Sequence, residues 1–394
     1  MIKKEVFWKN PGYKDTGSLK KDIECDTLIV GGGITGVSIA YFLQKRNKNK
    51  RIVLIEKNRI AGGATGRAAG ILTPCAESDL KDLIKIHGKE NGLIYYYHLL
   101  EALHQIKHII KKEKIDCDFE EEPTIYAEQR HRVFNKIIDE YEIEKKLHMK
   151  VKLLIGDSLK KEIHTQIFKH GIHGHRGYSI NPLKFTQNLS KIIRKRGVKL
   201  YEHTPLIEIK FNAATTPNAT IKFTKIILAT DIDIESNKII PIKSTIAVSQ
   251  RLTKEQLNTI GFPHKDILWD AKLDFNYLKF TKDNRILSGY GSKRISRGED
   301  KISFYEPHLK EIKSFLKEIF PDLNIKIEYA WSGTLGLHLH SIHFAKINFM
   351  PLIKIEDNKI KVLGTAGQVP AVMVAKYVSN KVFNKNSLLD KFFS

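Results

Sequence analysis

The chain is poor in the features that mark secreted and membrane proteins. Only three of its 394 residues are cysteine, an odd number without metal-ligand spacing, so we expect neither a disulfide framework nor a metal site. No run of 18 apolar residues occurs, and the first residues contain no apolar core. We therefore expect no membrane span, no secretory signal and a cytoplasmic protein.

Acidic residues are also scarce. The chain has 44 Asp and Glu against 66 Lys and Arg, which gives a formal net charge of +22. Such a charge could serve RNA, a membrane surface or acidic ligands. The lysines are scattered among many Ile and Asn residues, a texture that a biased genome composition would also produce. We therefore favour a general solvated basic surface over a nucleic-acid-binding face.

What the chain does contain is a complete strand–glycine–helix–strand unit between Asp26 and Glu56. An apolar run at 27–30 reads as a buried strand, and Gly31, Gly33 and Gly36 follow in the spacing G-x-G-x-x-G. A helical pattern at 37–45 leads to a second strand at 51–55, which ends on the glutamate. A lone G-x-G-x-x-G is weak evidence, but here every part occurs in the required order.

Each part of this unit has a physical role in holding a dinucleotide. Gly31 permits a tight turn, Gly33 lets a pyrophosphate approach the backbone, and Gly36 lets the helix pack closely on the strand. The helix N-terminus offers N–H groups to the phosphates. Glu56 can accept a hydrogen bond from a ribose 2′-OH, which favours FAD or NAD over a 2′-phosphorylated cofactor.

Two further segments are rich in small residues. Residues 62–72, GGATGRAAGIL, mark a place where the backbone approaches a ring system or phosphates, and Arg67 could contact a phosphate there. Near the C-terminus a strand at 360–363 runs into GTAGQ and then into a helix at 370–383, a second helix N-terminus suited to a polar or anionic group. Runs of alternating apolar and polar residues between 242 and 291 predict antiparallel strands of a second domain.

These motifs resemble those of the FAD-dependent D-amino-acid oxidase superfamily, in the style of glycine oxidase and sarcosine oxidase. The resemblance spans nearly the whole chain and is strongest in IVGGGITGVSIAYFLQK, VLIEK and GGATGRAAGIL. It implies an α/β fold with a discontinuous Rossmann-like FAD-binding domain and an α+β substrate domain built on an antiparallel sheet. The implied division is an arm (1–24), FAD-binding pieces at 25–115, 171–240 and 331–394, and substrate pieces at 116–170 and 241–330.

The resemblance also implies which residues hold FAD, non-covalently. Residues along the first unit would hold the pyrophosphate, the ribose and the approach to the ring, and the C-terminal turn would lie under the isoalloxazine. The implied set is Gly31, Gly33, Ile34, Thr35, Gly36, Glu56, Lys57, Ala64, Thr65, Arg67, Ala69, Gly70, Ile71, Leu206, Thr365, Ala366, Gly367, Gln368, Val369, Pro370 and Ala371. The implied chemistry is hydride transfer from a carbon bearing an amine, giving an imine, with reoxidation by O₂ or another acceptor.

The substrate half departs from the family pattern. Leu335 follows Trp331-Ser332-Gly333 where amino-acid-oxidising members carry an arginine that grips a carboxylate. Asp231 and Val369 each stand where a glycine is usual. A simple α-amino acid would then need Arg285, Arg294 or Lys293 as the carboxylate clamp, and a small amine or a larger amino compound fits equally well.

Few residues suggest themselves for catalysis. Tyr277 lies where related enzymes place a substrate-facing tyrosine, although a packed sheet aromatic is the plainer interpretation. His338, His340 and His343 lack Cys or acidic partners for a metal, so we take His338 only as a candidate base or substrate contact. The substrate set is thus Tyr277, Arg285 and Trp331, with Tyr277 and His338 as catalytic candidates.

Two alternatives of a different class stay open. One is an RNA-modifying flavoenzyme that acts on an amino-bearing side chain of a tRNA base, for which the charge would be suitable. The other is a FAD-binding protein that has lost catalysis, suggested by the three departures. The sequence leaves the oligomeric state open.

Overall fold

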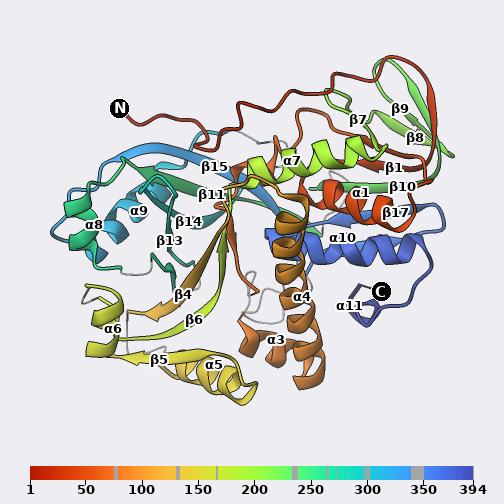
Figure 1. Ribbon diagram of the computed structural model, residues 1–394. Helices are drawn as coiled ribbons and strands as arrows, with labels where there is room; N and C mark the ends of the chain where they lie inside the picture. Colours follow the sequence, from red (N-terminus) through yellow and green to blue (C-terminus); the bar gives the residue numbers. More distant parts are fainter. Residues whose placement is uncertain are drawn as a thin grey trace.

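The protein is described by a computed structural model that covers residues 1–74, 79–129, 134–165, 167–232, 238–262, 265–272, 274–296, 299, 302–338 and 350–393. Two β-sheets organise these residues. In Figure 1 they lie side by side, with the mainly parallel sheet at the right and the mainly antiparallel sheet at the left. This arrangement confirms the predicted fold class.

The first sheet has eight strands in the order β16-β17-β10-β1-β2-β7, with the hairpin β8–β9 attached to β10. β1 lies in the middle and pairs in parallel with both β10 and β2, whereas β16 is an antiparallel edge strand. The central strands are apolar and buried because helices or loops cover both faces. The strand bounds are β1 Ile23–Val30, β2 Ile52–Ile55, β7 Lys199–Tyr201, β8 Glu208–Lys210, β9 Ala213–Thr215, β10 Thr220–Asp231, β16 Leu352–Ile355 and β17 Lys359–Leu363.

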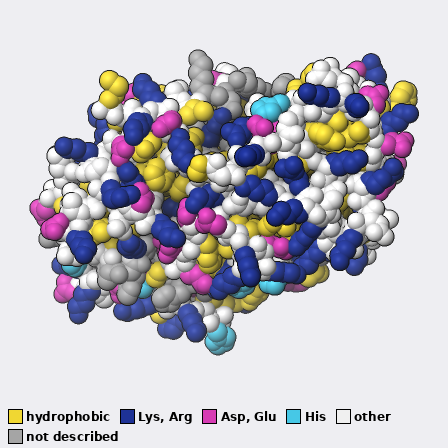
Figure 2. All heavy atoms as spheres, turned by 45° about the horizontal axis from the view of Figure 1, so that its top comes forward, with side chains coloured by type: hydrophobic (Ala, Val, Ile, Leu, Met, Phe, Trp, Pro, Cys, Tyr) yellow, Lys and Arg dark blue, Asp and Glu magenta, His cyan; other side chains and the backbone are white. Residues whose placement is uncertain are grey.

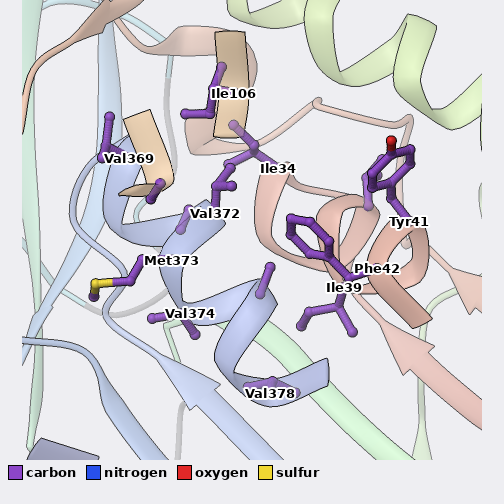
Figure 3. Packing of buried hydrophobic residues seen from close by; sticks show 14 of the residues in the cluster. Ile34, Ile39, Tyr41, Phe42, Ile106, Val369, Val372, Met373, Val374 and Val378 are labelled. Atoms are coloured by element: carbon purple, nitrogen blue, oxygen red, sulfur yellow. The ribbon is translucent and has the colours of Figure 1, made fainter. Parts of the chain in front are cut away.

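Four helices pack around this sheet: α1 (Ile34–Arg46), α4 (Lys89–Glu113), α7 (Pro182–Lys195) and α10 (Gln368–Val382). α1 packs against α10 and α7, and α10 also packs against α4. Figure 3 shows Ile34 and Ile39 of α1 beside Val372 and Val378 of α10. The N-termini of α1 and α10 are thereby brought together near the end of the central strand β1, although they are more than 300 residues apart in the chain.

The second sheet has nine strands in the order β15-β11-β14-β13-β12-β4-β6-β3, with β5 attached to β6. All its pairs are antiparallel except β12 with β4. A separate hydrophobic core lies between this sheet and α8, α6 and α9. The strand bounds are β3 Ile71–Leu72, β4 Glu120–Glu128, β5 Val151–Ile155, β6 His170–Ser179, β11 Ile239–Ser249, β12 Ile267–Asp270, β13 Tyr277–Phe280, β14 Ile286–Arg294 and β15 Ile327–His338.

The remaining helices are shorter or lie around the second sheet. Their bounds are α2 Ala64–Arg67, α3 Leu80–His87, α5 Phe134–Lys146, α6 Asp157–Glu162, α8 Lys254–Ile260, α9 Glu306–Ile319 and α11 Asp390–Phe393. Among the described residues, no helix is both long and apolar enough to cross a bilayer.

Strand pairing divides the chain differently from the expected boundaries at two places. β6 pairs along its length with β4, so the antiparallel sheet includes 170–179, which we had expected to lie mostly in the FAD-binding piece 171–240. β15 pairs with β11 as far as His338, whereas the expected FAD-binding piece began at 331. β6 carries three glycines and no long apolar run, so its sequence did not show which sheet it joins. Its backbone pairs with that of β4, which places it in the antiparallel sheet.

The N-terminal arm touches both sheets. Lys3 forms a bridge with Tyr329 of β15, and the indole of Trp8 donates to the carbonyl of Ala68 at 2.8 Å. Further along, the hydroxyl of Tyr13 donates to Glu202 at 3.1 Å. The arm therefore contacts residues of both sheets. We had expected it to lie over the first domain alone.

Candidate FAD and substrate site

A cavity of about 1650 Å³ runs between the two sheets. One end is lined by the strand ends and loops of the parallel sheet, the other by β12, β13 and β15 of the antiparallel sheet. Of the predicted cofactor residues, the described lining includes Gly31, Gly33, Ile34, Thr35, Glu56, Lys57, Ala64, Thr65, Arg67, Ala69, Gly70, Ile71, Leu206, Thr365, Gly367, Gln368 and Val369. These residues come from five separate stretches of sequence.

The three glycines of the fingerprint are required for different reasons. Gly31 has a φ of +113°, and a Cβ there would lie 2.3 Å from the carbonyl oxygen of Ala229. A Cβ at Gly36 would lie 2.0 Å from the carbonyl oxygen of Gly31, so this glycine allows α1 to pack onto β1. At Gly33 a Cβ would meet only the hydroxyl of Thr65, at 3.2 Å, and the residue otherwise faces the cavity. Gly33 therefore keeps space open for a ligand.

Glu56 directly follows β2 and lines the same cavity. Its carboxylate accepts the backbone N–H of Gly32 at 2.6 Å and that of Asn58 at 2.9 Å. Each carboxylate oxygen keeps a further lone pair for a ribose hydroxyl. Lys57 and Leu206 line the cavity beside it, as expected for the adenosine end.

The loop 64–72 is held in place by buried donors from distant elements. Trp331 donates from its indole to the carbonyl of Arg67 at 2.9 Å, and the buried ammonium of Lys279 donates to the carbonyl of Gly70 at 3.2 Å. Gly70 also accepts the backbone N–H of Ile180 at 2.9 Å. Trp331 is fully buried and absent from the described cavity lining, so the structure gives it a positioning role in place of the substrate contact we had expected.

The C-terminal turn meets the first helix at the cavity. The hydroxyls of Thr35 and Thr365 lie 3.3 Å apart, and Gly367, with a φ of +91°, is the N-cap residue immediately before α10. Ala366, Pro370 and Ala371 are buried behind this surface and lie outside the described lining. They support the turn instead of facing the cavity.

Several residues of the lining have polar side-chain atoms without a hydrogen-bond partner among the described residues. Both amide atoms of Gln368 are buried and unpaired, as are the hydroxyl of Thr334 and one carboxylate oxygen of Asp231. These atoms have almost no accessible surface even without a ligand, so the fit to a dinucleotide rests on the space at Gly33 and on the size of the cavity. The cavity has the size and the phosphate-binding glycines that FAD requires.

Asp231 replaces the usual glycine at a position with a φ of +64°, a conformation that Asp tolerates better than most residues. Its carboxylate accepts the backbone N–H of Gly336 at 3.0 Å and so links the end of β10 to β15. Burial raises the pKa of the Asp231 carboxyl to about 6, and hydrogen bonds from the backbone of Gly336 and Thr365 oppose this rise. The departure from glycine is thus accommodated without loss of the fold.

The lining contributed by the antiparallel sheet and its loops combines aromatic and apolar residues with charged ones such as Asp270, Lys272 and Asp274. Tyr277 and Leu335 belong to this lining, together with Trp269 of β12. A Cβ at Gly289, on the neighbouring strand, would lie 2.1 Å from the Tyr277 hydroxyl, so that glycine makes room for the ring. The structure therefore places Tyr277 in the cavity lining, and its contact with a substrate stays a prediction.

The basic residues named as possible carboxylate clamps lie elsewhere. Arg285 donates to Asp283 at 2.8 Å, to Glu328 at 2.5 Å and to the carbonyl of Ser249 at 2.8 Å. The ammonium of Lys293 lies 3.8 Å from the ring centre of Tyr305. Neither these two nor Arg294 is among the described residues that line the cavity. Of the arginines, only Arg67 appears in that lining.

His338 is also placed away from the cavity lining. It is buried at the end of β15, and its Nδ1 lies 3.1 Å from the carbonyl oxygen of Met350. Because a carbonyl can only accept, Nδ1 carries the proton in this contact. His340 and His343 lie outside the described residues.

Sequence reasoning missed another part of the lining. Asp79, Tyr126 and Lys136 come from three different elements, and their side chains are joined by contacts of 3.0 and 2.8 Å to the Asp79 carboxylate. They line the cavity with Trp269, whose ring stacks on Tyr126 at 5.7 Å. No local pattern marks these residues, because the pairing of β4 with β12 brings Tyr126 to Trp269, and side-chain contacts from the start of α3 and from α5 bring Asp79 and Lys136 to them.

The basic residues do not gather on the face shown in Figure 2. Lys and Arg side chains are spread over that face, with Asp and Glu between them. This is the distribution expected of a general solvated basic surface.

Comparison with known proteins agrees with the geometry. The family model "FAD dependent oxidoreductase" matches residues 26–375. A probable oxidoreductase, OrdL, of Haemophilus influenzae is 25% identical over 82% of this chain and 76% of its own length. Gamma-glutamylputrescine oxidoreductase of Escherichia coli is also 25% identical, over 83% of this chain and 77% of its own length.

The structural comparison reaches the same fold. Glycine oxidase from Geobacillus kaustophilus superposes with a TM-score of 0.78 at 15% identity, over 94% of this chain and 98% of that one. Together with the family match and the cavity lined by the dinucleotide fingerprint, these findings confirm the predicted resemblance and cofactor. The chain belongs to the DAO family of FAD-dependent oxidoreductases.

Proposed function

We propose that this enzyme oxidises the C–N bond of an amine or amino acid to an imine, with O₂ or another acceptor taking the electrons afterwards. The observation that carries the proposal is that Tyr277, Trp269 and Leu335 line the same cavity as the predicted FAD-binding residues; we call these three residues the substrate wall. A wall of this kind excludes water and orients an apolar carbon bearing a nitrogen.

FAD, when bound, supplies the acceptor for a hydride. The substrate carbon loses that hydride, the nitrogen lone pair forms the C=N bond, and the nitrogen loses one proton. Water then hydrolyses the imine to a carbonyl compound and an amine or ammonia. The chain has little acid–base work to do if the amine arrives neutral, so Tyr277 and Leu335 act by positioning and by excluding water.

The same wall supports an amine without an adjacent carboxylate over a simple α-amino acid. Leu335 offers no positive charge, and Arg285 is held by Asp283 and Glu328. The lysines in this part of the lining already face acids, Lys136 with Asp79 at 2.8 Å and Lys272 with Asp270 at 3.5 Å, so a substrate carboxylate would have to compete with those acids or use Arg67. A relative that covers most of the chain is named for an amine, gamma-glutamylputrescine.

The test is anaerobic mixing of the FAD-loaded protein with panels of amines, α-amino acids and alcohols while the flavin absorbance is followed. We expect bleaching by at least one amine. Bleaching by alcohols alone would contradict the proposal, and so would a flavin that neither amines nor amino acids reduce.

A variant sharpens the substrate class. Leu335→Arg places a cation where amino-acid-oxidising relatives carry one, so it is expected to favour α-amino acids and to weaken turnover of the best amine. Leu335→Met, which keeps the wall apolar, is the matched control and is expected to retain the amine preference. Equal effects of the two substitutions would remove Leu335 from the specificity argument.

A further inference from the structure

One part of the cavity reverses the charge balance of the chain. The protein has 66 Lys and Arg against 44 Asp and Glu, yet acids outnumber basic residues in the described lining that comes from α3, α5, the antiparallel sheet and its loops. We call this part of the lining the acidic end. A lining of this kind attracts cations although the whole protein is basic. The acids of the acidic end are Asp79, Asp82, Asp270, Asp274 and Glu299, and its basic residues are Lys136 and Lys272.

Three of these acids already have a lysine beside them. Each such pair lowers the attraction of the acid for a further cation, because the lysine compensates its charge. The pairs are Lys136 with Asp79 at 2.8 Å, Lys272 with Asp270 at 3.5 Å and Lys243 with Glu299 at 3.3 Å.

The other two acids, Asp82 and Asp274, have no basic partner in an ion pair among the described residues. Asp82 lies in the first turn of α3 and is partly buried. Asp274 lies in the loop between β12 and β13, is exposed, and accepts a hydrogen bond from the Tyr290 hydroxyl, which carries no charge. Both residues line the cavity and stay accessible in it. The acidic end therefore has negative charge available to a ligand.

Aromatic rings line the same end of the cavity. Trp269 stacks on Tyr126 with ring centres 5.7 Å apart, and the rings of Phe275 and Tyr277 lie 6.0 Å apart. All four residues belong to the lining. The faces of aromatic rings attract alkylammonium groups, and the attraction grows when water is excluded. Rings and acids together favour a cationic ligand.

The protein itself shows an alkylammonium group in such surroundings. The ammonium of Lys136 lies 5.7 Å from the ring centre of Tyr126 and 2.8 Å from the Asp79 carboxylate. Its side chain is 31% exposed, so this contact is made at the surface of the cavity. A primary ammonium on a short carbon chain is thus a group that this end of the cavity can accommodate.

We propose that the substrate carries a second, protonated nitrogen, as a diamine does, and that this nitrogen binds at the acidic end beside Asp82 and Asp274. One nitrogen of such a molecule arrives neutral at the carbon to be oxidised, and the other stays charged and fixes the orientation. The inference rests on the proposed oxidation of a C–N bond and names the class of amine that the cavity selects.

The test uses the FAD-loaded enzyme and three compounds of equal chain length: an unbranched alkylamine, the α,ω-diamine and the ω-amino acid. The rate constant of anaerobic flavin reduction, divided by the apparent Kd of the compound, is compared. The diamine is expected to exceed the alkylamine by at least about fivefold, because it adds an ion pair and a ring contact. The ω-amino acid should be the poorest, and added salt should reduce the preference for the diamine.

Variants locate the charge that is responsible. Asp82→Asn and Asp274→Asn are each expected to reduce the preference for the diamine over the alkylamine, and the double variant should lose most of it. Asp322→Asn removes a charge from an exposed position outside the described lining, so this matched control should keep the preference. An unchanged preference in the double variant would overturn the placement. The substrate series on wild type decides the matter if a variant does not fold.

The outcomes separate this inference from the proposed function. Equal efficiency of diamine and alkylamine would overturn the inference and leave the oxidation of amines standing. The highest efficiency for the ω-amino acid would also overturn it, because the lysines of the lining would then outweigh the acids. A flavin that neither amines nor amino acids reduce would instead contradict the proposed function itself.

Discussion

At the scale of single residues, three glycines of one motif serve packing, chain reversal and ligand space separately. Gly36 and Gly31 are surrounded by backbone oxygen atoms of the protein itself. Gly33 has ordinary extended dihedrals, φ −72° and ψ 178°, and faces the cavity. The pattern G-x-G-x-x-G therefore combines two residues needed for the fold with one needed for the cofactor.

This division predicts opposite outcomes for two valine substitutions. Gly33→Val is expected to fold, with the free energy of unfolding of the apoprotein changed by no more than about 1 kcal/mol, and to bind little or no FAD. Gly36→Val is expected not to fold, because its Cβ would lie 2.0 Å from a backbone oxygen. Circular dichroism and flavin content after purification distinguish them. Normal flavin content in Gly33→Val would contradict the placement of the pyrophosphate.

Asp231 predicts a pH-dependent loss of stability. Its pKa is raised from 3.8 to about 6 in the folded protein, so the folded state holds its proton more tightly than the unfolded state. Stability is therefore lost as the pH rises from about 4 to about 6, and Asp231→Asn escapes that loss. In the apoprotein, the Asn variant should be more stable than wild type above pH 6, by at most about 3 kcal/mol.

Denaturant unfolding at several pH values checks this. Asn keeps an acceptor for Gly336 and tolerates the positive φ, so it isolates the charge. A stability difference that is constant from pH 4 to pH 7 would show that the Asp231 carboxyl is not perturbed as described.

At the scale of elements, Arg285 illustrates how a side chain that looks functional can be structural. It follows the turn between β13 and β14 and binds that turn to β11 through Ser249 and to β15 through Glu328. Its side chain is mostly buried, with 13% exposed. The substrate role expected from the sequence gives way to a structural one, because three acceptors occupy the guanidinium.

Arg285→Met is accordingly expected to lower the free energy of unfolding by about 1–3 kcal/mol, because acceptors on three strands or turns lose a charged donor. Arg251→Met is the matched control. Arg251 contacts the same Asp283 at 3.6 Å but is 68% exposed, so its loss should cost less than about 0.5 kcal/mol. Both variants should keep the KM of wild type. A raised KM for Arg285→Met at unchanged stability would return the residue to the substrate site.

At the scale of the whole molecule, the site exists only where the two sheets face each other. Val30 of β1 and Leu228 of β10 line one side of the cavity, and Tyr277 and Leu335 line the other. The N-terminal arm and the tryptophans that hold the loop 64–72 join the two halves around it. FAD in this cavity would contact both sheets at once.

FAD is therefore expected to stabilise the molecule as one unit. At a hundred times its Kd, FAD should add about 2.7 kcal/mol to the free energy of unfolding. Hydrogen exchange should slow both at the end of β10 and in β13 and β15. Gly33→Val, which should not bind FAD, is expected to show neither effect. Protection confined to the parallel sheet would contradict a cofactor that spans the cavity.

The cofactor half of this protein was predictable from sequence because its signals are local. Strand, glycines, helix and terminal glutamate follow one another within about thirty residues, and each is required by backbone sterics or by phosphate binding. The loop 62–72 and the turn before α10 are also short, continuous segments. For these parts the chain encodes geometry directly, and the structure brings most of the named residues to one cavity.

The substrate half was decided by tertiary structure. Whether Trp331, Arg285 or His338 faces the cavity depends on which neighbours hold its hydrogen-bonding groups. Those neighbours can be far away in the chain: Arg67, which accepts from Trp331, is 264 residues away. Tyr126 and Trp269 likewise meet because β4 pairs with β12, and Asp79 joins them from the start of α3 through its contact with the Tyr126 hydroxyl. Long-range pairing leaves no local pattern. Sequence alone therefore determined the cofactor, and the packing of two sheets determined which side chains meet the substrate.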